Sequence, residues 1–210
     1  MQVERFTGGY FQTNSYLLTG NEGAILFDAP EGALSWLATL GQEIDALVLT
    51  HLHYDHIIDA AAIARQHECP VYAHSAPTAD LTLETVLRDA VGWPVEIEPF
   101  KVSHPLAGES AVRIGAIDLA ILHVPGHSPD SLCFGPVPLD GDGSALIGGD
   151  VLFRDGIGRT DFPHGDHALL LAGIREKLFV LPGDTRVLPG HGPETTIATE
   201  MASNPFLTGE

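Results

Sequence analysis

The chain has 210 residues, 44% of them hydrophobic, which is enough for one domain with a substantial core. It carries 10 Lys and Arg against 28 Asp and Glu, and this net charge of −18 argues against nucleic acid and anionic membranes as partners. No apolar stretch is long enough to span a bilayer, and residues 1–6 lack a signal-peptide pattern. We therefore expect a single cytoplasmic domain over residues 1–210, in which Cys69 and Cys133 are buried thiols rather than a disulfide.

The first half of the chain predicts strands and helices in alternation. Residues 14–19 and 24–29 are predicted to form a hairpin through the turn at 20–23. A helix over 30–40, ended by Gly41, should follow. The next predicted elements are a strand at 44–49, a helix from near His56, a strand at 70–73 and a helix at 79–90.

The second half continues the mixture. A hairpin is predicted from 112–114 and 117–122, and short strands are predicted at 131–134, 145–147 and 186–188. Asp166 is expected to cap a helix that runs to about Leu181, because apolar residues recur there at helical spacing. A last helix is predicted at 194–202. The class is therefore α/β, although the pattern alone does not give the topology.

The densest group of candidate ligands follows the predicted strand 44–49. His51, His53, Asp55 and His56 lie within six consecutive residues of a strand-to-helix loop. His51 and His53 are two residues apart, so an extended backbone directs both side chains to one face, where they can chelate one divalent metal. Asp55 and His56 lie at the turn into the helix and could hold a second metal. Without a metal, burial of these groups would leave polar atoms unsatisfied, at roughly 1–3 kcal/mol each.

Three further loops, each after a predicted strand, hold one His or Asp beside glycine or proline: His127, Asp150 and His191. Such neighbours form tight turns and let the backbone approach a ligand closely. Taken singly, each is more often a structural turn residue. Together with the first group they give five His and two Asp, and nitrogen and oxygen ligands without thiolate suit zinc, iron or manganese.

These motifs, in this order, resemble the metallo-β-lactamase superfamily. The second half more particularly resembles the short bacterial glyoxalase II-like hydrolases (hydroxyacylglutathione hydrolase-like), which lack the C-terminal helical domain of full-length glyoxalase II. The segments that carry this second likeness are 149–153, 158–163, 165–167, 189–196 and 204–207. The resemblance implies an αββα sandwich of two mixed sheets flanked by helices, with the site at one edge.

The resemblance also implies the roles of the candidate ligands. One metal is assigned to His51, His53 and His127, the other to Asp55, His56 and His191, with Asp150 bridging the two. Asp55 is in addition the residue expected to take part in catalysis. The implied cofactors are two divalent ions, zinc in the first place and iron or manganese as alternatives.

The activity implied by the resemblance is hydrolysis of a small thioester such as S-lactoylglutathione, by attack of a metal-bridging hydroxide. Two divalent ions contribute +4, while Asp55, Asp150 and the hydroxide contribute −3, so the site suits a polarised or anionic acyl group. A thiolate leaving group, with a conjugate-acid pKa near about 8.5, needs little help from a general acid. The expected partner is therefore a small-molecule acyl thioester.

Three other functions stay open. A related group, the persulfide dioxygenases, uses one iron, which His51, His127 and Asp150 would hold here, and shares a segment like residues 158–162. Against that reading, residues 190–196 look more like the hydrolases. A lactonase or β-lactamase is a weaker alternative, and a non-catalytic binding module is weaker still because no ligand is missing.

Several residues outside the ligand set are singled out without a settled role. His123 is predicted to be structural, and His74 is a candidate for the mouth of the site. Arg159 and Asp161 are either groups that orient ligands or a salt-bridged loop, with no preference between them. Asp130 stands where the family commonly has glycine and adds a negative charge near one ligand loop.

Overall fold

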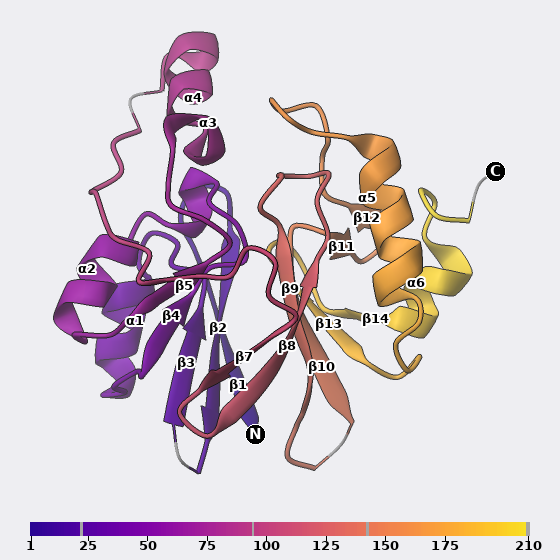
Figure 1. Cartoon of the computed structure of the whole chain (residues 1–210), viewed down its shortest axis with the longest axis horizontal. Helices are drawn as coiled ribbons and strands as arrows, with labels where there is room; N and C mark the ends of the chain where they lie inside the picture. The colour runs from indigo at the N-terminus through magenta and orange to yellow at the C-terminus, as the bar shows by residue number, and fades with distance from the viewer. Residues whose placement is uncertain (22, 94, 142, 209–210) are drawn as a thin grey trace.

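Two β-sheets pack face to face between two layers of helices in the computed structural model, which describes residues 1–21, 23–93, 95–141 and 143–208. Figure 1 shows the layers side by side. Helices α1 (Ala33–Leu40) and α2 (Ala60–Gln66) lie on the left, and α5 (His167–Gly173) and α6 (Ile197–Ser203) on the right. The predicted α/β class and αββα sandwich are confirmed.

The first sheet is mixed. Its strands are, in spatial order, β1 (Gln2–Gly8), β2 (Thr13–Gly20), β3 (Gly23–Phe27), β4 (Ala46–Val48), β5 (Val71–Ala73) and β6 (His104–Pro105). The strands from β1 to β3 are antiparallel, whereas those from β3 to β6 are parallel. Parallel neighbours need long crossovers, and α1 lies in the one from β3 to β4 and α2 in the one from β4 to β5. The loop that carries His51 leaves this sheet at the carboxyl end of β4.

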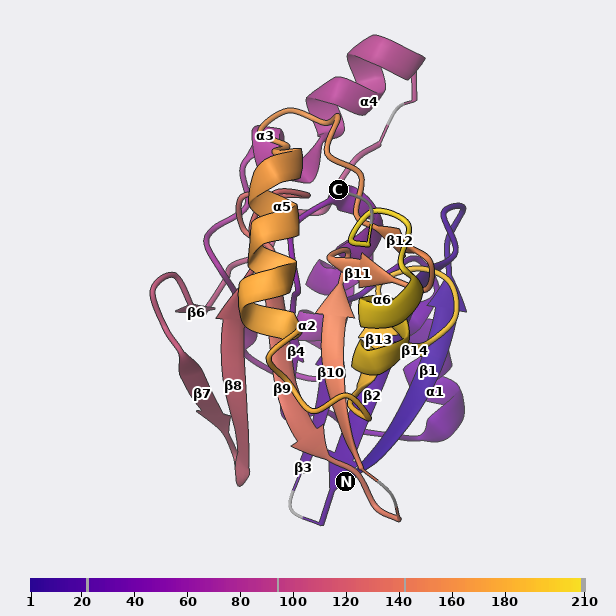
Figure 2. The same ribbon diagram turned by 90° about the vertical axis from the view of Figure 1, so that its right-hand side faces the viewer.

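The second sheet is also mixed. Its spatial order is β14 (Thr195–Thr196), β13 (Arg186–Pro189), β10 (Ser144–Gly149), β9 (Leu132–Pro138), β8 (Ile117–His123) and β7 (Ala111–Ile114). Only β10 and β13 are parallel neighbours among these described strands, and Gly149 pairs with Pro189 at their carboxyl ends. This register places the loops of Asp150 and His191 side by side. A small hairpin, β11 (Leu152–Phe153) and β12 (Gly156–Ile157), follows β10 (Figure 2).

Each sheet buries both faces, because alternate residues point to opposite sides of a strand. In β2, Tyr16 and Leu18 pack in the cluster between the sheets, while Leu17 packs in the cluster under α1 and α2. Phe27 and Phe134 meet between the sheets with ring centroids 5.5 Å apart. This double burial explains why the strands that lead to the candidate ligands have so few polar residues.

The fold differs from the sequence-based expectation in several places; for example, the helix expected from near His56 begins only at Ala60. Strand β1 was not predicted, because most of its residues are exposed or half-buried and its pattern is weak. The predicted helix 79–90 is divided into α3 (Ala79–Thr82) and α4 (Glu84–Val91) by Leu83, which adopts a left-handed conformation with φ 61°. The break turns α4 upward, away from the sandwich (Figure 1).

The C-terminal elements follow the prediction with changed bounds. Asp166 caps α5 by accepting a hydrogen bond from Leu169 N at 2.9 Å, and a π-helical turn, η2 (Ile174–Leu178), continues the helix. The last helix begins at Ile197 rather than 194, because Thr195 and Thr196 pair with β13.

Both cysteines are buried free thiols, as predicted. Among the described residues, no helix has the length and apolar character needed to cross a bilayer.

Candidate metal centre

The seven predicted ligand side chains lie together at one edge of the sandwich. Three groups have all their donor atoms within 4.8 Å of one another: His51 with His53 and His127, His51 with His56 and Asp150, and Asp55 with His56 and His191. Four of them come from adjacent segments of the chain. His51 and His53 lie in the loop after β4, and Asp55 and His56 lie in a 3-10 turn, η1 (Tyr54–His56). The grouping is the one expected for two neighbouring metal sites.

Asp150 lies between the group of His51, His53 and His127 and the group of Asp55, His56 and His191. Its Oδ1 is 3.4 Å from His56 Nε2, and its Oδ2 is 3.5 Å from His127 Nε2 and 3.3 Å from His191 Nε2. On the other side, Asp55 Oδ2 is 3.2 Å from His191 Nε2. One carboxylate therefore faces both groups of imidazoles, which is the position a bridging ligand requires.

The inward atoms of this cluster lack hydrogen-bond partners among the described residues. Nε2 of His51, His56 and His127, and Oδ1 of Asp150, are buried and unpaired. Burial of an unsatisfied polar atom costs roughly 1–3 kcal/mol, so four of them in one place call for a ligand. Imidazole nitrogens and carboxylate oxygens fit a divalent cation of the zinc, iron or manganese type.

The outward ring nitrogens are fixed by hydrogen bonds. His56 Nδ1 donates to Asp28 Oδ2 at 2.9 Å, His127 Nδ1 to the Arg159 carbonyl at 2.8 Å, and His191 Nδ1 to the Phe11 carbonyl at 3.0 Å. A proton held on Nδ1 leaves the lone pair of Nε2 pointing into the cluster. The tautomers therefore suit metal binding through Nε2.

Asp28 is a residue that the sequence analysis missed. Its carboxylate also accepts hydrogen bonds from the backbone N–H and the hydroxyl of Thr50, both at 2.8 Å. The Thr50 hydroxyl in turn accepts from His51 Nδ1 at 3.1 Å. One buried carboxylate thus orients His56 directly and His51 through Thr50. The available signal was an acidic residue at the end of the apolar strand 24–29.

Polar residues of β2 were missed as well. Thr13 donates to Asp55 Oδ2 at 2.7 Å, and Asn14 Nδ2 donates to the carbonyls of Pro189 and Gly192, both at 2.9 Å. These bonds fix Asp55 and the loop of His191 from the first sheet. Nothing in the local sequence of β2 indicates a contact with residues about 175 positions away.

Glycine at 190 permits the close approach expected of the ligand loops. A Cβ on Gly190 would overlap Asp150 Oδ1 and come within 2.8 Å of His56 Cε1. The prediction that glycine neighbours let backbone approach a ligand is confirmed at this position.

The histidines divide into two kinds by charge. Burial, together with the neighbouring imidazoles, lowers the pKa of His51 well below its usual range and that of His53 to about 3. Burial also acts to lower the pKa of His56 and His191, but the carboxylates of Asp55 and Asp150 outweigh it, and that of His191 rises to about 10. In the metal-free protein, burial therefore favours the neutral form of His51 and His53, while the carboxylates favour the protonated form of His56 and His191.

Metal uptake at neutral pH is therefore expected to release protons. A metal needs the neutral imidazole, so His56 and His191 must each lose a proton, giving about two per chain. Because their pKa values are raised, protons compete more strongly as pH falls, and metal affinity should fall with it. Calorimetric titration of zinc into metal-free protein, in two buffers of different ionisation enthalpy, measures the number released. Uptake without proton release would contradict these charge states.

A cavity of about 290 Å³ opens above the cluster. Its floor is polar, with His53, Asp55, His127, Asp150 and His191, whereas its walls are mostly apolar. The walls are formed by Phe11, Tyr54, Leu83, Leu87, Phe153, Ile157, Arg159 and Phe162. A small acyl group thus has room against apolar surface directly over the candidate metal ligands.

The remaining sequence candidates have structural surroundings. His123 Nε2 donates to the Pro129 carbonyl at 2.8 Å, consistent with a structural role. His74 packs on His123, with ring centroids 4.7 Å apart, and does not line the cavity above the cluster. Arg159 and Asp161 form an ion pair with contacts of 2.6 and 2.7 Å. It is the Arg159 carbonyl, not the guanidinium, that orients a candidate ligand.

Asp130 is buried, with one carboxylate oxygen bonded to Ser128 Oγ and the other unpaired. Burial raises its pKa, so the charged form destabilises the fold increasingly as pH rises from about 4. Asp130→Asn is expected to leave metal content unchanged, because Asp130 is not among the donor groups. In metal-free protein, the melting temperature of the variant relative to wild type should rise between pH 4 and 7. A melting-temperature difference between variant and wild type that falls over this pH range, or a lower metal content in the variant, would contradict this expectation.

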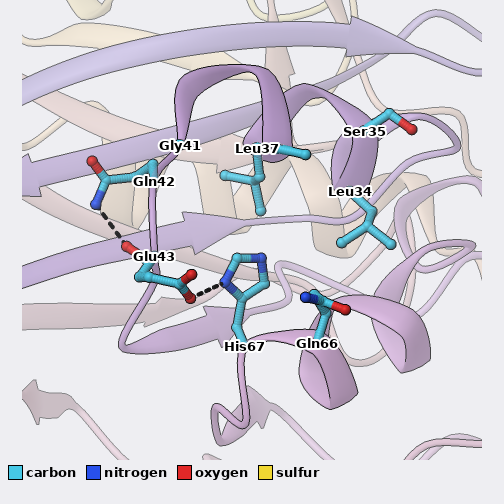
Figure 3. Close-up of a pocket in the computed structure, with 9 residues that line it drawn as sticks. Leu34, Ser35, Leu37, Gly41, Gln42, Glu43, Gln66 and His67 are labelled. Atoms are coloured by element: carbon cyan, nitrogen blue, oxygen red, sulfur yellow. Dashed lines mark hydrogen bonds and ion pairs between the residues drawn. The ribbon is translucent and has the colours of Figure 1, made fainter.

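A second large cavity lies elsewhere. It is a groove of about 450 Å³ beside α1 and α2, where His67 Nδ1 is 2.8 Å from Glu43 Oε2 (Figure 3). None of the unpaired buried atoms found among the described residues belongs to its lining. The chemistry of the molecule is therefore concentrated at the first cavity.

Several curated relatives match the whole chain. The probable metallo-hydrolase YqgX of Bacillus subtilis is 36% identical over 212 residues, covering 100% of this chain and 99% of that protein. The hydroxyacylglutathione hydrolase GloC of Haemophilus influenzae is 34% identical over 217 residues, covering 100% of both.

Solved structures give the same picture. The BLEG-1 B3 metallo-beta-lactamase superposes with a TM-score of 0.86 at 36% identity, covering 99% of this chain and 100% of that one. TTHA1623 in a di-iron-bound form gives 0.81 at 37% identity, covering 97% and 100%. ETHE1 from Myxococcus xanthus gives 0.71 at 27% identity, covering 98% and 84%. The model of the metallo-beta-lactamase superfamily matches residues 8–191. The chain belongs to the metallo-beta-lactamase superfamily.

Proposed function

We propose that this protein is a dinuclear metal hydrolase that cleaves small acyl thioesters, in the manner of glyoxalase II. One observation carries the proposal: Asp150, on the floor of an apolar-walled cavity, lies within 3.5 Å of His127 of one donor group and of His56 and His191 of another. The relatives named metallo-hydrolase and hydroxyacylglutathione hydrolase support it.

In this proposal His51, His53 and His127 would hold one ion, Asp55, His56 and His191 would hold the other, and Asp150 would serve both. Divalent ions bound by these residues would lower the pKa of a water towards about 7 and polarise an acyl carbonyl. The di-iron form of TTHA1623 makes iron a candidate beside zinc and manganese.

The reaction adds water across the thioester. The water oxygen forms a bond to the carbonyl carbon, the carbon–sulfur bond breaks, and a carboxylic acid and a thiol result. Asp55, which accepts a hydrogen bond from Thr13 at 2.7 Å, is the residue proposed to orient the attacking water. The thiolate leaves without a general acid, since its conjugate-acid pKa is near about 8.5.

Hydrolysis of S-lactoylglutathione by the metal-loaded protein tests the proposal, with thioester loss followed spectroscopically. Turnover that disappears on chelation and returns with added metal is the expected result. No turnover across a panel of thioesters, with two ions per chain confirmed by elemental analysis, would overturn it.

Two other reactions are compared in the same assays. The similarity to the BLEG-1 B3 metallo-beta-lactamase favours a β-lactam as the first alternative substrate. A persulfide dioxygenase would instead contain one iron per chain and consume oxygen with glutathione persulfide. The complete second donor group of Asp55, His56 and His191 favours the dinuclear hydrolase.

A further inference from the structure

The cavity above the metal donors adjoins a second hollow of about 220 Å³. Phe11, Tyr54 and Asp55 line both, so the two hollows are direct neighbours. We call the second hollow the aromatic chamber, after Tyr10, Phe11, Tyr54 and Trp93, which contribute its rings. The donor-atom floor belongs to the first cavity, and the chamber lies beside it.

The aromatic rings of the chamber pack against one another. Tyr10 and Trp93 meet edge to face with centroids 4.8 Å apart, and Phe11 and Tyr54 do so at 5.5 Å. Tyr10 nevertheless remains 76% exposed. Aromatic side chains kept at the mouth of a site, at the cost of exposed apolar surface, are typical of ligand binding.

Tyr54 supplies a second, independent indication of a ligand. Its side chain is buried, with 8% of the residue exposed, and its hydroxyl has no hydrogen-bond partner among the described residues. A phenol is protonated at neutral pH, so the hydroxyl can donate a hydrogen bond. An acceptor on a bound molecule would satisfy it.

The charges around the chamber are negative. Glu31 and Glu96 line it, whereas the charge of Asp55, between it and the first cavity, would be offset by a bound metal ion. Among the described residues lining the two hollows, Arg159 is the only Lys or Arg, and Asp161 neutralises it. Arg159 also stacks on Phe162, 4.1 Å from the ring centroid. An anionic arm would meet carboxylates here and no free cation.

We propose that the aromatic chamber binds the leaving-thiol half of the substrate, that this half carries a cationic group, and that Tyr54 donates a hydrogen bond to an acceptor within it. The inference rests on the proposed thioester hydrolase function. The first cavity has room for a small acyl group, so the chamber is left for the thiol. Aromatic faces and carboxylates together favour an ammonium group.

Three thioesters with the same acetyl group test the charge preference. Their thiols are thiocholine, which is cationic, N-acetylcysteamine, which is uncharged, and 3-mercaptopropionate, which is anionic. We expect kcat/KM to fall in that order, by about tenfold from the first to the last. Equal values, or the highest value for the anionic thioester, would overturn the proposal.

Direct binding separates this inference from the proposed reaction. Trp36→Phe leaves Trp93 as the one tryptophan of the chain, and its fluorescence should change saturably with choline but not with 3-hydroxypropionate. If choline binds and no thioester is hydrolysed, the proposed function fails and the cationic chamber stands. If thioesters are hydrolysed and choline does not bind, the chamber proposal fails alone.

Two variants identify the groups responsible. The double variant Glu31→Gln/Glu96→Gln should bring the ratio of kcat/KM for the cationic and anionic thioesters close to one. The matched control Glu109→Gln/Glu176→Gln removes the same charge from exposed positions outside both hollows and should keep the ratio. If the ratio changed equally in both double variants, the effect would come from net charge alone, and the assignment of Glu31 and Glu96 to the charge preference would be overturned.

Tyr54→Phe removes only the hydroxyl. We expect it to raise KM for the N-acetylcysteamine thioester, which offers an amide acceptor, by roughly fivefold, and to raise KM more than it lowers kcat. An unchanged KM would show that the hydroxyl does not contact the ligand.

Discussion

Replacement of Asp150 by asparagine is expected to reduce bound metal below two ions per chain and to abolish hydrolysis, while the fold survives. Asp150 faces His56 on one side and His127 and His191 on the other, all within 3.5 Å. Asparagine keeps the size of the side chain but removes the charge. Two divalent ions would then repel each other with less compensation, and their repulsion is strong at the short separations of a dinuclear site.

For the Asp150→Asn protein, elemental analysis measures the bound metal and circular dichroism checks that the fold survives. Asp130→Asn serves as the matched control, because it makes the same chemical change at another buried aspartate outside the donor groups. The control is expected to keep two ions and full turnover. Two tightly held ions in the Asp150→Asn protein would show that the bridging role is wrongly assigned, and with it the dinuclear mechanism.

The candidate ligands could be predicted from the sequence because each lies in a short motif at the end of an apolar strand. His51 to His56 occupy one loop, so their proximity is local. Asp150 and His191 come together because β10 and β13 are parallel neighbours, a pairing that the pattern of apolar residues does not state. Here the order of motifs, and not their periodicity, carried the information.

The walls and supports of the site could not be predicted in the same way. Asp28 and Thr13 act on ligands that are 28 and 42 residues away in the chain, and their own surroundings in sequence look like ordinary strand. The α3–α4 segment, predicted as one helix, contributes Leu83 and Leu87 to the cavity and is broken at Leu83 by a left-handed backbone conformation. These contacts depend on tertiary packing, which overrides local propensity.

Asp28→Asn is the second substitution with a large expected effect, although Asp28 lies outside the donor groups. The carboxylate accepts from Thr50 through two bonds of 2.8 Å and from His56 Nδ1 at 2.9 Å. Asparagine tolerates the left-handed backbone of this position, φ 58°, and should keep the fold. Its amide can no longer offer two acceptor oxygens, so either Thr50 or His56 loses its partner.

If His56 loses its partner, the proton can move to Nε2 and block the lone pair that faces the cluster. We therefore expect Asp28→Asn to weaken metal binding by about 10–100-fold, mainly at the group of Asp55, His56 and His191, with turnover falling in parallel. Asp45→Asn is the matched control, because Asp45 Oδ2 also accepts a hydrogen bond in the first sheet, from Ala24 N at 2.7 Å, but contacts no candidate ligand. It should lower stability without changing metal affinity. Equal metal affinity in the two variants would show that Asp28 stabilises the fold alone, and that His56 is oriented by the packing around it.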